Sequence, residues 1–247
     1  SDEYENTIYV FGPEGIYPFP EANEKGESIL KWGISGSNPG EINGPTGLAF
    51  NKENNLYVVD SKNNRIQLFS DTGEFIKTWG SGGNSYGEFS YPWGIYIDSE
   101  DNIYVADWGN DRVQKFNSEG DHLLTFGEGD NPAGKLSRPA HVAIDYDGDV
   151  YITDWGNQRV QIFEANGEIL TSLYGDAVDY TKAGLYVLNR DSDTMKSVNQ
   201  NSNKTFFEKF GRPTGISINK ANQIIIADTR CRLQIYQKDN EYSEPSA

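Results

Sequence analysis

The stretch PWGIYIDSEDNIYVADWGNDRVQKF, residues 92–116, decides the fold because similar stretches flank it. PTGLAFNKENNLYVVDSKNNRIQLF begins at Pro45 and PAHVAIDYDGDVYITDWGNQRVQIF begins at Pro139, so the copies start 47 residues apart. Alternating apolar residues between clusters of Asn, Asp and Gly predict short strands and tight turns. One copy therefore predicts one antiparallel sheet of four strands, which in the first copy are residues 47–50, 55–60, 65–69 and 74–80.

A sheet of this size cannot bury its faces alone. Repeats of roughly 40 to 50 residues with four strands each predict blades stacked around an axis, which is the β-propeller. A weaker copy begins at Pro213, and the degenerate segment 176–211 is expected to be less constrained. The first repeat, about residues 1–33, matches only the second to fourth strands of a blade, so both termini are expected to take part in closing the ring. We expect one all-β domain, 1–247, with six blades, and a ring of five blades is the alternative. The units are about 1–33, 45–80, 92–127, 139–175, 176–211 and 213–247.

Composition excludes several classes of function. The formal net charge of -16 opposes binding to nucleic acid, and no cluster of Lys and Arg offsets it. No apolar stretch approaches the roughly 20 residues of a membrane span. The single cysteine, Cys231, excludes an internal disulfide and a cysteine-rich zinc site. We expect the protein to act outside the cytoplasm or at a cell surface.

Two phrases carry a family resemblance. YVADWGNDRVQKF, ending at Phe116, and YITDWGNQRVQIF, ending at Phe163, strongly resemble NHL repeats. The resemblance covers Pro45–Gly175 closely and the remainder loosely. It implies a propeller, commonly with six blades. It does not imply one function, because NHL propellers bind RNA, bind proteins, sense ligands or catalyse lyase reactions.

Histidines bear on the enzymatic members of the family. The resemblance implies that a lyase carries metal-binding His directly after the Pro that opens an inner strand. His122 is instead expected to be solvated near an outer strand, and His141 near an inner strand either contacts a ligand at the channel mouth or packs. The positions after Pro hold other residues: Thr46, Trp93, Ala140 and Thr214. We therefore predict no enzyme; a metal-assisted lyase or lactonase with carboxylate ligands at the channel mouth is the alternative.

Two motifs have simpler interpretations than cofactor binding. DYDGD, residues 145–149, occupies the first hairpin turn of its blade and lacks the distal bidentate Glu of a calcium loop. GDNPAGK, residues 129–135, is followed by Leu136 where a phosphate loop needs Ser or Thr. No cofactor is predicted, and no specific motif supports calcium.

An Asp at the end of the second strand and an Arg four or five residues later recur in the repeats. Recurrence favours a structural role, in which the carboxylate bonds turn amides and pairs with the Arg. The pairs are Asp60 with Arg65, Asp107 with Arg112, Asp154 with Arg159, and Asp228 with Arg232.

The predicted binding surface is the loop-rich face. Connections 34–44, 81–91 and 128–138 share this face with the turns between second and third strands, and function usually lies on such loops. Ile42, Phe89 and Leu136 are predicted to pack between blades. Large aromatic side chains beside Asp and Asn favour a protein or glycan partner, although Trp108 and Trp155 also suit packing. The candidates are Trp93, Trp108, Trp155, Tyr86, Tyr91 and His141.

Overall fold

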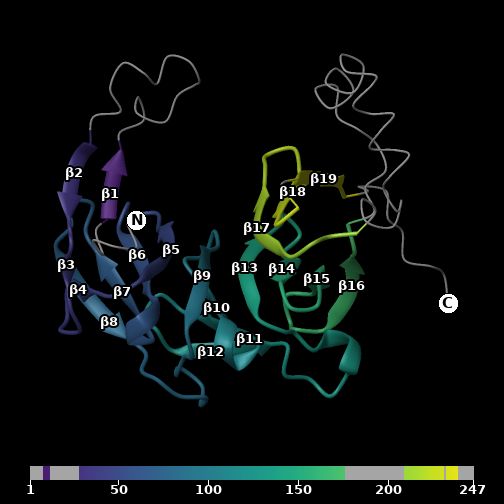
Figure 1. Ribbon diagram of the computed structural model, residues 1–247, viewed down its shortest axis with the longest axis horizontal. Helices are drawn as coiled ribbons and strands as arrows, with labels where there is room; N and C mark the ends of the chain where they lie inside the picture. The colour runs from purple at the N-terminus through teal and green to yellow at the C-terminus, as the bar shows by residue number, and fades with distance from the viewer. Residues whose placement is uncertain (1–7, 12–27, 176–208, 231, 239–247) are drawn as a thin grey trace. The chain divides into compact units, whose positions relative to one another are not determined.

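The computed structural model describes residues 8–11, 28–175, 209–230 and 232–238 (Figure 1). In this part of the chain every long element is a β-strand, and the helical turns are 3-10 turns of three residues. The chain divides into two compact units, Ser1–His141 and Val142–Ala247. The boundary falls inside strand β13, Pro139–Ile144, and each unit is described by itself.

The first unit contains two four-stranded antiparallel sheets whose strands follow one another in chain order. They match the strands predicted from the alternation of apolar residues. The first sheet is β5 (Pro45–Phe50), β6 (Leu56–Asp60), β7 (Arg65–Phe69) and β8 (Phe75–Trp79). The second is β9 (Pro92–Ile97), β10 (Ile103–Asp107), β11 (Arg112–Phe116) and β12 (His122–Phe126).

The N-terminal strands differ from their predicted arrangement. β1 (Ile8–Phe11) pairs directly with β2 (Ser28–Trp32), with Ile8 opposite Trp32. Direct hydrogen bonding leaves no room for a third strand between them, so they are not the second and fourth strands of one blade. The predicted intermediate strand falls in residues 12–27, outside the described residues.

The second unit contains one four-stranded and one three-stranded antiparallel sheet. The sequence predicts a degenerate blade over residues 176–211. Residues 176–208 of this segment lie outside the described residues. The number of blades and the single domain stay predictions. The four-stranded sheet is β13, β14 (Val150–Asp154), β15 (Arg159–Phe163) and β16 (Ile169–Leu173); the other is β17 (Pro213–Ile218), β18 (Gln223–Asp228) and β19 (Arg232–Gln237).

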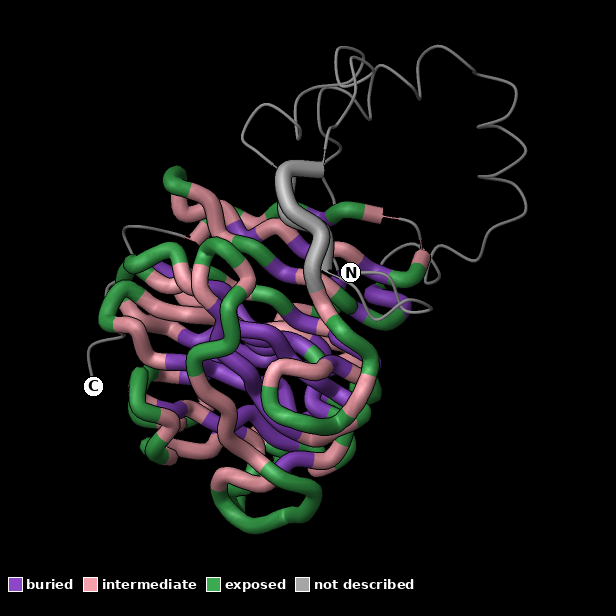
Figure 2. Tube along the Cα trace, turned by 90° about the vertical axis from the view of Figure 1, so that its left-hand side faces the viewer, coloured by how far each residue is buried: buried purple, intermediate pink, exposed green. Residues whose placement is uncertain are grey.

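In the four-stranded sheets, buried residues concentrate in the second and third strands; buried residues are drawn purple in Figure 2. All five residues of β6, β10 and β14 are buried. The predicted packing residues of the connections are confirmed: Ile42 and Phe89 are fully buried and Leu136 is 6% exposed. Phe89 joins the core cluster around Tyr57 and Phe116. Each connection therefore inserts one apolar side chain into the core.

Glycine in the third position of an inner strand permits close packing of neighbouring sheets in the first unit. A Cβ on Gly47 would lie 2.6 Å from the backbone oxygen of Trp93 and 3.0 Å from the amide nitrogen of Ile95. Thr46 Oγ1 donates a hydrogen bond to the same Trp93 oxygen at 2.8 Å. The backbone beneath Trp93 is thus fixed by contacts with the preceding inner strand.

Each sheet has two ends with different turns. We call the end with the connections and the second-to-third strand turns the loop-rich end, and the opposite end the hairpin end. At the hairpin end, Asp145 Oδ1 accepts hydrogen bonds from the amides of Asp147 and Asp149 at 2.9 and 3.0 Å. Asp98 accepts the equivalent bonds from Glu100 and Asn102. DYDGD is therefore a hairpin turn like its siblings.

Candidate functional site

The recurrent Asp is the centre of a buried polar network. Asp107 is fully buried, and its Oδ2 accepts hydrogen bonds from Arg112 Nε at 2.9 Å, Asn110 Nδ2 at 2.9 Å and Gln114 Nε2 at 3.2 Å. Its Oδ1 accepts from the amide of Ser90, in the connection before the sheet, at 2.7 Å. Burial raises the pKa of Asp107, and these donors oppose the rise. The network therefore keeps a carboxylate where an isolated one is unfavourable.

The arginine of each pair holds the connection in place. Arg65 Nη1 donates to the carbonyl of Ser37, and Nη2 donates to the carbonyls of Asn38 and Glu41, each at 2.8 Å. Arg112 Nη2 donates in the same way to the carbonyls of Ser85 and Glu88. The predicted structural role of the Asp and Arg pairs is confirmed and extends to positioning the loops.

A buried glutamine completes the network and was missed in the sequence. Gln67 Nε2 donates to the Glu41 carbonyl at 2.7 Å, and Gln67 Oε1 accepts from the Gly40 amide at 2.9 Å. Gln114 makes the equivalent bonds with Glu88 and Gly87. The signal was present, because Gln follows Arg by two residues in all three close copies.

Trp93 and Tyr91 lie exposed at the loop-rich end of the first unit. Trp93 is 49% exposed and Tyr91 is 58% exposed. Tyr91 has a φ of 47°, and its amide donates to Asn64 Oδ1 at 2.8 Å. This conformation is uncommon for a bulky residue, above all directly before proline. Hydrogen bonding of the backbone therefore holds both aromatic residues in position.

Tyr86 lies over His122 within the first unit. The rings stack with centroids 4.3 Å apart and an interplanar angle of 5°, and Tyr86 stays 64% exposed. The other contacts of His122 are an edge-on packing against Phe116 and a 2.7 Å hydrogen bond between Nε2 and Thr125 Oγ1. His122, predicted to be solvated, is half-buried, because the connection folds back over the outer strand.

The His122 environment predicts a dependence of stability on pH. Burial, followed by the charge of Arg112, lowers the pKa of His122. Protons therefore bind the unfolded chain first as the pH falls through about 6.5, and the folded state loses stability below that value. We expect the melting temperature to fall more steeply between pH 7.5 and 5.5 in the wild type than in His122→Gln. Parallel profiles would contradict this.

Trp108 and Trp155 each carry an arginine on the ring. In the first unit the Arg138 guanidinium lies 4.8 Å from the Trp108 ring centroid. In the second unit the Arg212 guanidinium lies 4.0 Å from the Trp155 ring centroid. Both tryptophans are half-buried. Each tryptophan therefore packs against an arginine, which is one of the two roles that the sequence allowed. In each case the arginine directly precedes the proline that opens an inner strand.

The predicted candidates therefore fall into separate groups. Trp93, Tyr91 and Tyr86 expose aromatic surface in the first unit, to which His141 also belongs, half-buried in β13. Trp155 belongs to the second unit. That these candidates form one binding surface stays a prediction, as does ligand contact by His141.

The second unit contains a lysine bound by three carboxylates. Lys238 Nζ donates to Oδ2 of Asp145, Asp147 and Asp149, each at 2.7 Å. The Asp145 side chain is fully buried, and its Oδ2 also accepts from the Tyr151 hydroxyl at 3.0 Å. Burial lowers the pKa of Lys238, but the three hydrogen bonds outweigh burial and raise it above the ordinary value. DYDGD thus binds a cation that belongs to the chain.

Two further features are absent from the described residues. These residues include no group of three or more His, Cys, Asp or Glu side chains placed to hold a metal ion. Within the same ranges, no helix is long and apolar enough to cross a membrane.

Solved structures provide the class of fold. The chain is similar to a catalytically inactive variant of virginiamycin B lyase from Staphylococcus aureus with quinupristin, with a TM-score of 0.56 and 13% identity over 97% of this chain and 65% of that chain. It also resembles a protein of unknown function from Bacteroides caccae, with a TM-score of 0.50 and 12% identity over 75% and 56% of the chains. This chain spans less than two thirds of either length. At these identities the likenesses bear on the fold alone, and the fold is a β-propeller.

The repeats place the chain within that class. Residues 43–69, 89–116 and 136–163 match the NHL repeat family. The chain therefore contains three NHL repeats, as the resemblance implied, within a β-propeller fold. Among curated proteins, none matches its sequence significantly.

Proposed function

We propose that this propeller is a noncatalytic scaffold that binds a protein or glycan partner through its loop-rich ends. The observation that carries the proposal is that three aromatic side chains of the first unit are each exposed: Trp93 and Tyr91 at the loop-rich end, and Tyr86 of the connection over His122. Aromatic side chains are enriched in binding sites because they bury a large area with few rotatable bonds. On loops held by backbone hydrogen bonds, they bind with little loss of conformational entropy.

The charge distribution of the first unit also supports the loop-rich end as the binding surface. The hairpin end carries most of its acidic turn residues, among them Glu53, Asp98, Glu100 and Asp121. At the loop-rich end, Glu41 and Glu88 instead accept hydrogen bonds from Asn38 and Ser85 within their own connections. A partner approaching the loop-rich end therefore meets aromatic surface and fewer free carboxylates.

Replacing Trp93 tests the proposal directly. We expect Trp93→Ala to weaken capture of the native partner by at least about tenfold, because loss of an anchoring Trp typically costs about 2 kcal/mol of binding energy. Its melting temperature should change little, since about half of the side chain is exposed. Binding is measured by capture from the source organism, and stability by thermal unfolding.

Two variants serve as controls. Tyr146→Ala removes a 72% exposed aromatic side chain from the hairpin end and should leave capture unchanged. Trp108→Ala removes a ring that is stacked on Arg138 and should lower the melting temperature instead. Full capture by Trp93→Ala would contradict the proposed surface.

The alternative is a metal-assisted lyase or lactonase acting at the channel mouth. Near-stoichiometric calcium or zinc that resists dialysis of the purified protein would favour it over a noncatalytic scaffold. We further propose that the protein acts outside the cytoplasm or at a cell surface, which fractionation of the source cells tests.

A further inference from the structure

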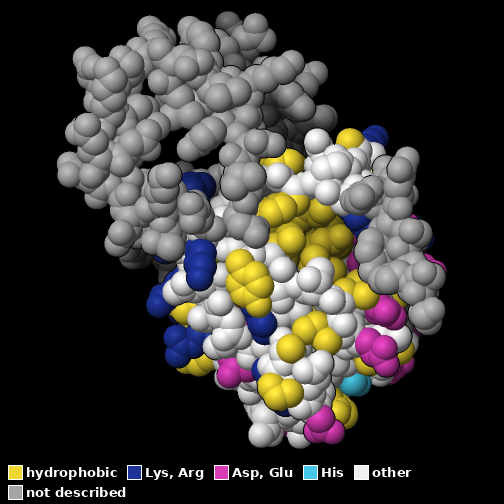
Figure 3. Space-filling view, turned by 90° about the vertical axis from the view of Figure 1, so that its right-hand side faces the viewer, with side chains coloured by type: hydrophobic (Ala, Val, Ile, Leu, Met, Phe, Trp, Pro, Cys, Tyr) yellow, Lys and Arg dark blue, Asp and Glu magenta, His cyan; other side chains and the backbone are white. Residues whose placement is uncertain are grey.

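The two ends of the second unit differ in charge. The turns at its hairpin end contain Asp145, Asp147, Asp149, Glu164 and Glu168. The described residues of its loop-rich end contain the cations Lys209, Arg212 and Arg230, while the carboxylates there, Asp154 and Asp228, are buried and bonded to Arg159 and Arg232. In Figure 3 most Lys and Arg side chains gather on the left and most Asp and Glu on the right. Among its described residues, the loop-rich end of the second unit is therefore locally positive in a chain of net charge -16.

Arg212 is held in a fixed orientation at this end. Its guanidinium stacks 4.0 Å from the ring centroid of Trp155, and the residue is exposed. Its backbone is fixed on both sides, because its amide donates to Thr229 Oγ1 at 3.0 Å and its carbonyl accepts from the Thr229 amide at 3.1 Å. A guanidinium stacked on a ring still presents N–H groups at its edge, a geometry that matches a carboxylate.

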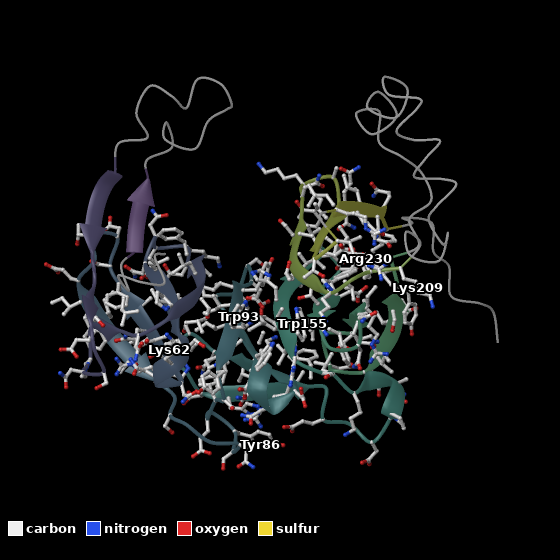
Figure 4. All side chains as sticks on the ribbon, viewed as in Figure 1. Lys62, Tyr86, Trp93, Trp155, Lys209 and Arg230 are labelled. Carbon is white, nitrogen blue, oxygen red and sulfur yellow. The ribbon has the colours of Figure 1, made fainter. Side chains whose placement is uncertain are left out.

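Lys209 lies on a segment that the neighbouring turn anchors. Arg230 Nη1 donates to the Lys209 carbonyl at 2.8 Å, and Arg232 Nη2 donates to the same oxygen (Figure 4). Among the described residues, no carboxylate forms an ion pair with Lys209 or Arg212. Hydrogen bonds with Ser172 and Arg159 lower the pKa of Tyr174, an exposed residue at the same end. The surroundings thus favour negative charge.

We propose that the loop-rich end of the second unit docks an acidic peptide segment of a partner protein, with carboxylates bound by Arg212 and Lys209. This inference rests on the proposed binding function and narrows its partner class. A neutral glycan is disfavoured because a sugar stacks on an open aromatic face, whereas Arg212 covers Trp155. A nucleic acid is disfavoured because a long polyanion extends past these few cations onto an acidic surface.

A labelled glutamate-rich peptide is the probe, and the full chain is the binding protein. Peptide affinity is measured by fluorescence anisotropy at low and at physiological ionic strength. We expect Arg212→Gln to weaken peptide binding by about tenfold or more. The affinity of Arg212→Lys should lie between those of Arg212→Gln and the wild type, because lysine keeps the positive charge but lacks the paired N–H donors of the guanidinium. Lys220→Gln, the same charge change at the hairpin end, should bind like the wild type.

Three outcomes would overturn the inference: equal affinity of Arg212→Gln and wild type, equal loss in Lys220→Gln, or tighter binding of a single-stranded RNA than of the peptide. Thermal unfolding shows whether Arg212→Gln is folded. If Arg212→Gln does not fold, the test rests on the peptide affinity of Arg212→Lys. Capture of the native partner separates the two proposals. If Trp93→Ala loses capture while Arg212→Gln retains it, the scaffold function stands and the acidic-peptide site falls.

Discussion

Asp107→Ala is expected to lower the free energy of unfolding by about 3 to 5 kcal/mol, because it removes the fully buried carboxylate partner of Arg112 and leaves this guanidinium only the partly exposed Glu128, 2.9 Å from its Nη1. The Arg112 side chain is only 3% exposed. The change also removes the acceptor for Ser90, Asn110 and Gln114. Domains of this kind are stable by about 5 to 15 kcal/mol, so the loss is a large share of the total.

Urea unfolding measures this effect as a lower midpoint with an unchanged slope. Asp107→Asn keeps the shape and part of the hydrogen bonding, so its loss should be smaller. Asp71→Ala, an acidic residue exposed in a turn, is the matched control and should stay within about 0.5 kcal/mol of the wild type. A loss below about 1 kcal/mol in Asp107→Ala would show that the network is dispensable.

Lys238→Met should destabilise the second unit by about 2 to 3 kcal/mol, because it leaves Asp145, Asp147 and Asp149 facing one another without a cation. The expected loss is below that of a fully buried pair because the Lys238 side chain is 24% exposed. Since the folded pKa of Lys238 is raised, its contribution is complete at neutral pH. It is lost only as the pH rises above the ordinary lysine value of about 10.4.

A double-mutant cycle tests the repulsion. In the Lys238→Met background, Asp147→Asn should restore part of the stability, whereas in the wild-type background it should cost stability. Lys52→Met removes a single exposed partner of Asp101, 3.7 Å away, and should cost no more than about 1 kcal/mol. If Lys238→Met unfolds at the same urea concentration as Lys52→Met, the three hydrogen bonds contribute little.

Local patterns allowed the strands and the recurrent ion pairs to be predicted. Apolar alternation and turn residues act over a few positions, so β5 to β16 in the close copies could be placed from composition and spacing alone. Asp60 and Arg65 lie five residues apart, and antiparallel pairing sets them opposite each other. Repetition of the pair identified it as structural before its contacts were known.

Contacts between distant residues could not be predicted. Lys238 bonds Asp145 across 93 positions, and no local signal marks a single lysine after a strand as the partner of an acidic turn. Arg138 and Arg212 stack on tryptophans earlier in the chain, whereas Tyr86 stacks on His122 in the repeat that follows it. Such pairs depend on how loops fold back over neighbouring strands, which one sequence does not encode locally.

The way in which the connections are anchored affects how this surface can change. Arg65 and Gln67, like Arg112 and Gln114, bind the connections through main-chain oxygens, which every amino acid provides. The anchor therefore tolerates new side chains at outward positions of residues 34–44 and 81–91 while the loop path is kept. Mutation or laboratory selection can diversify the surface without rebuilding the blades, much as hypervariable loops vary on a constant framework.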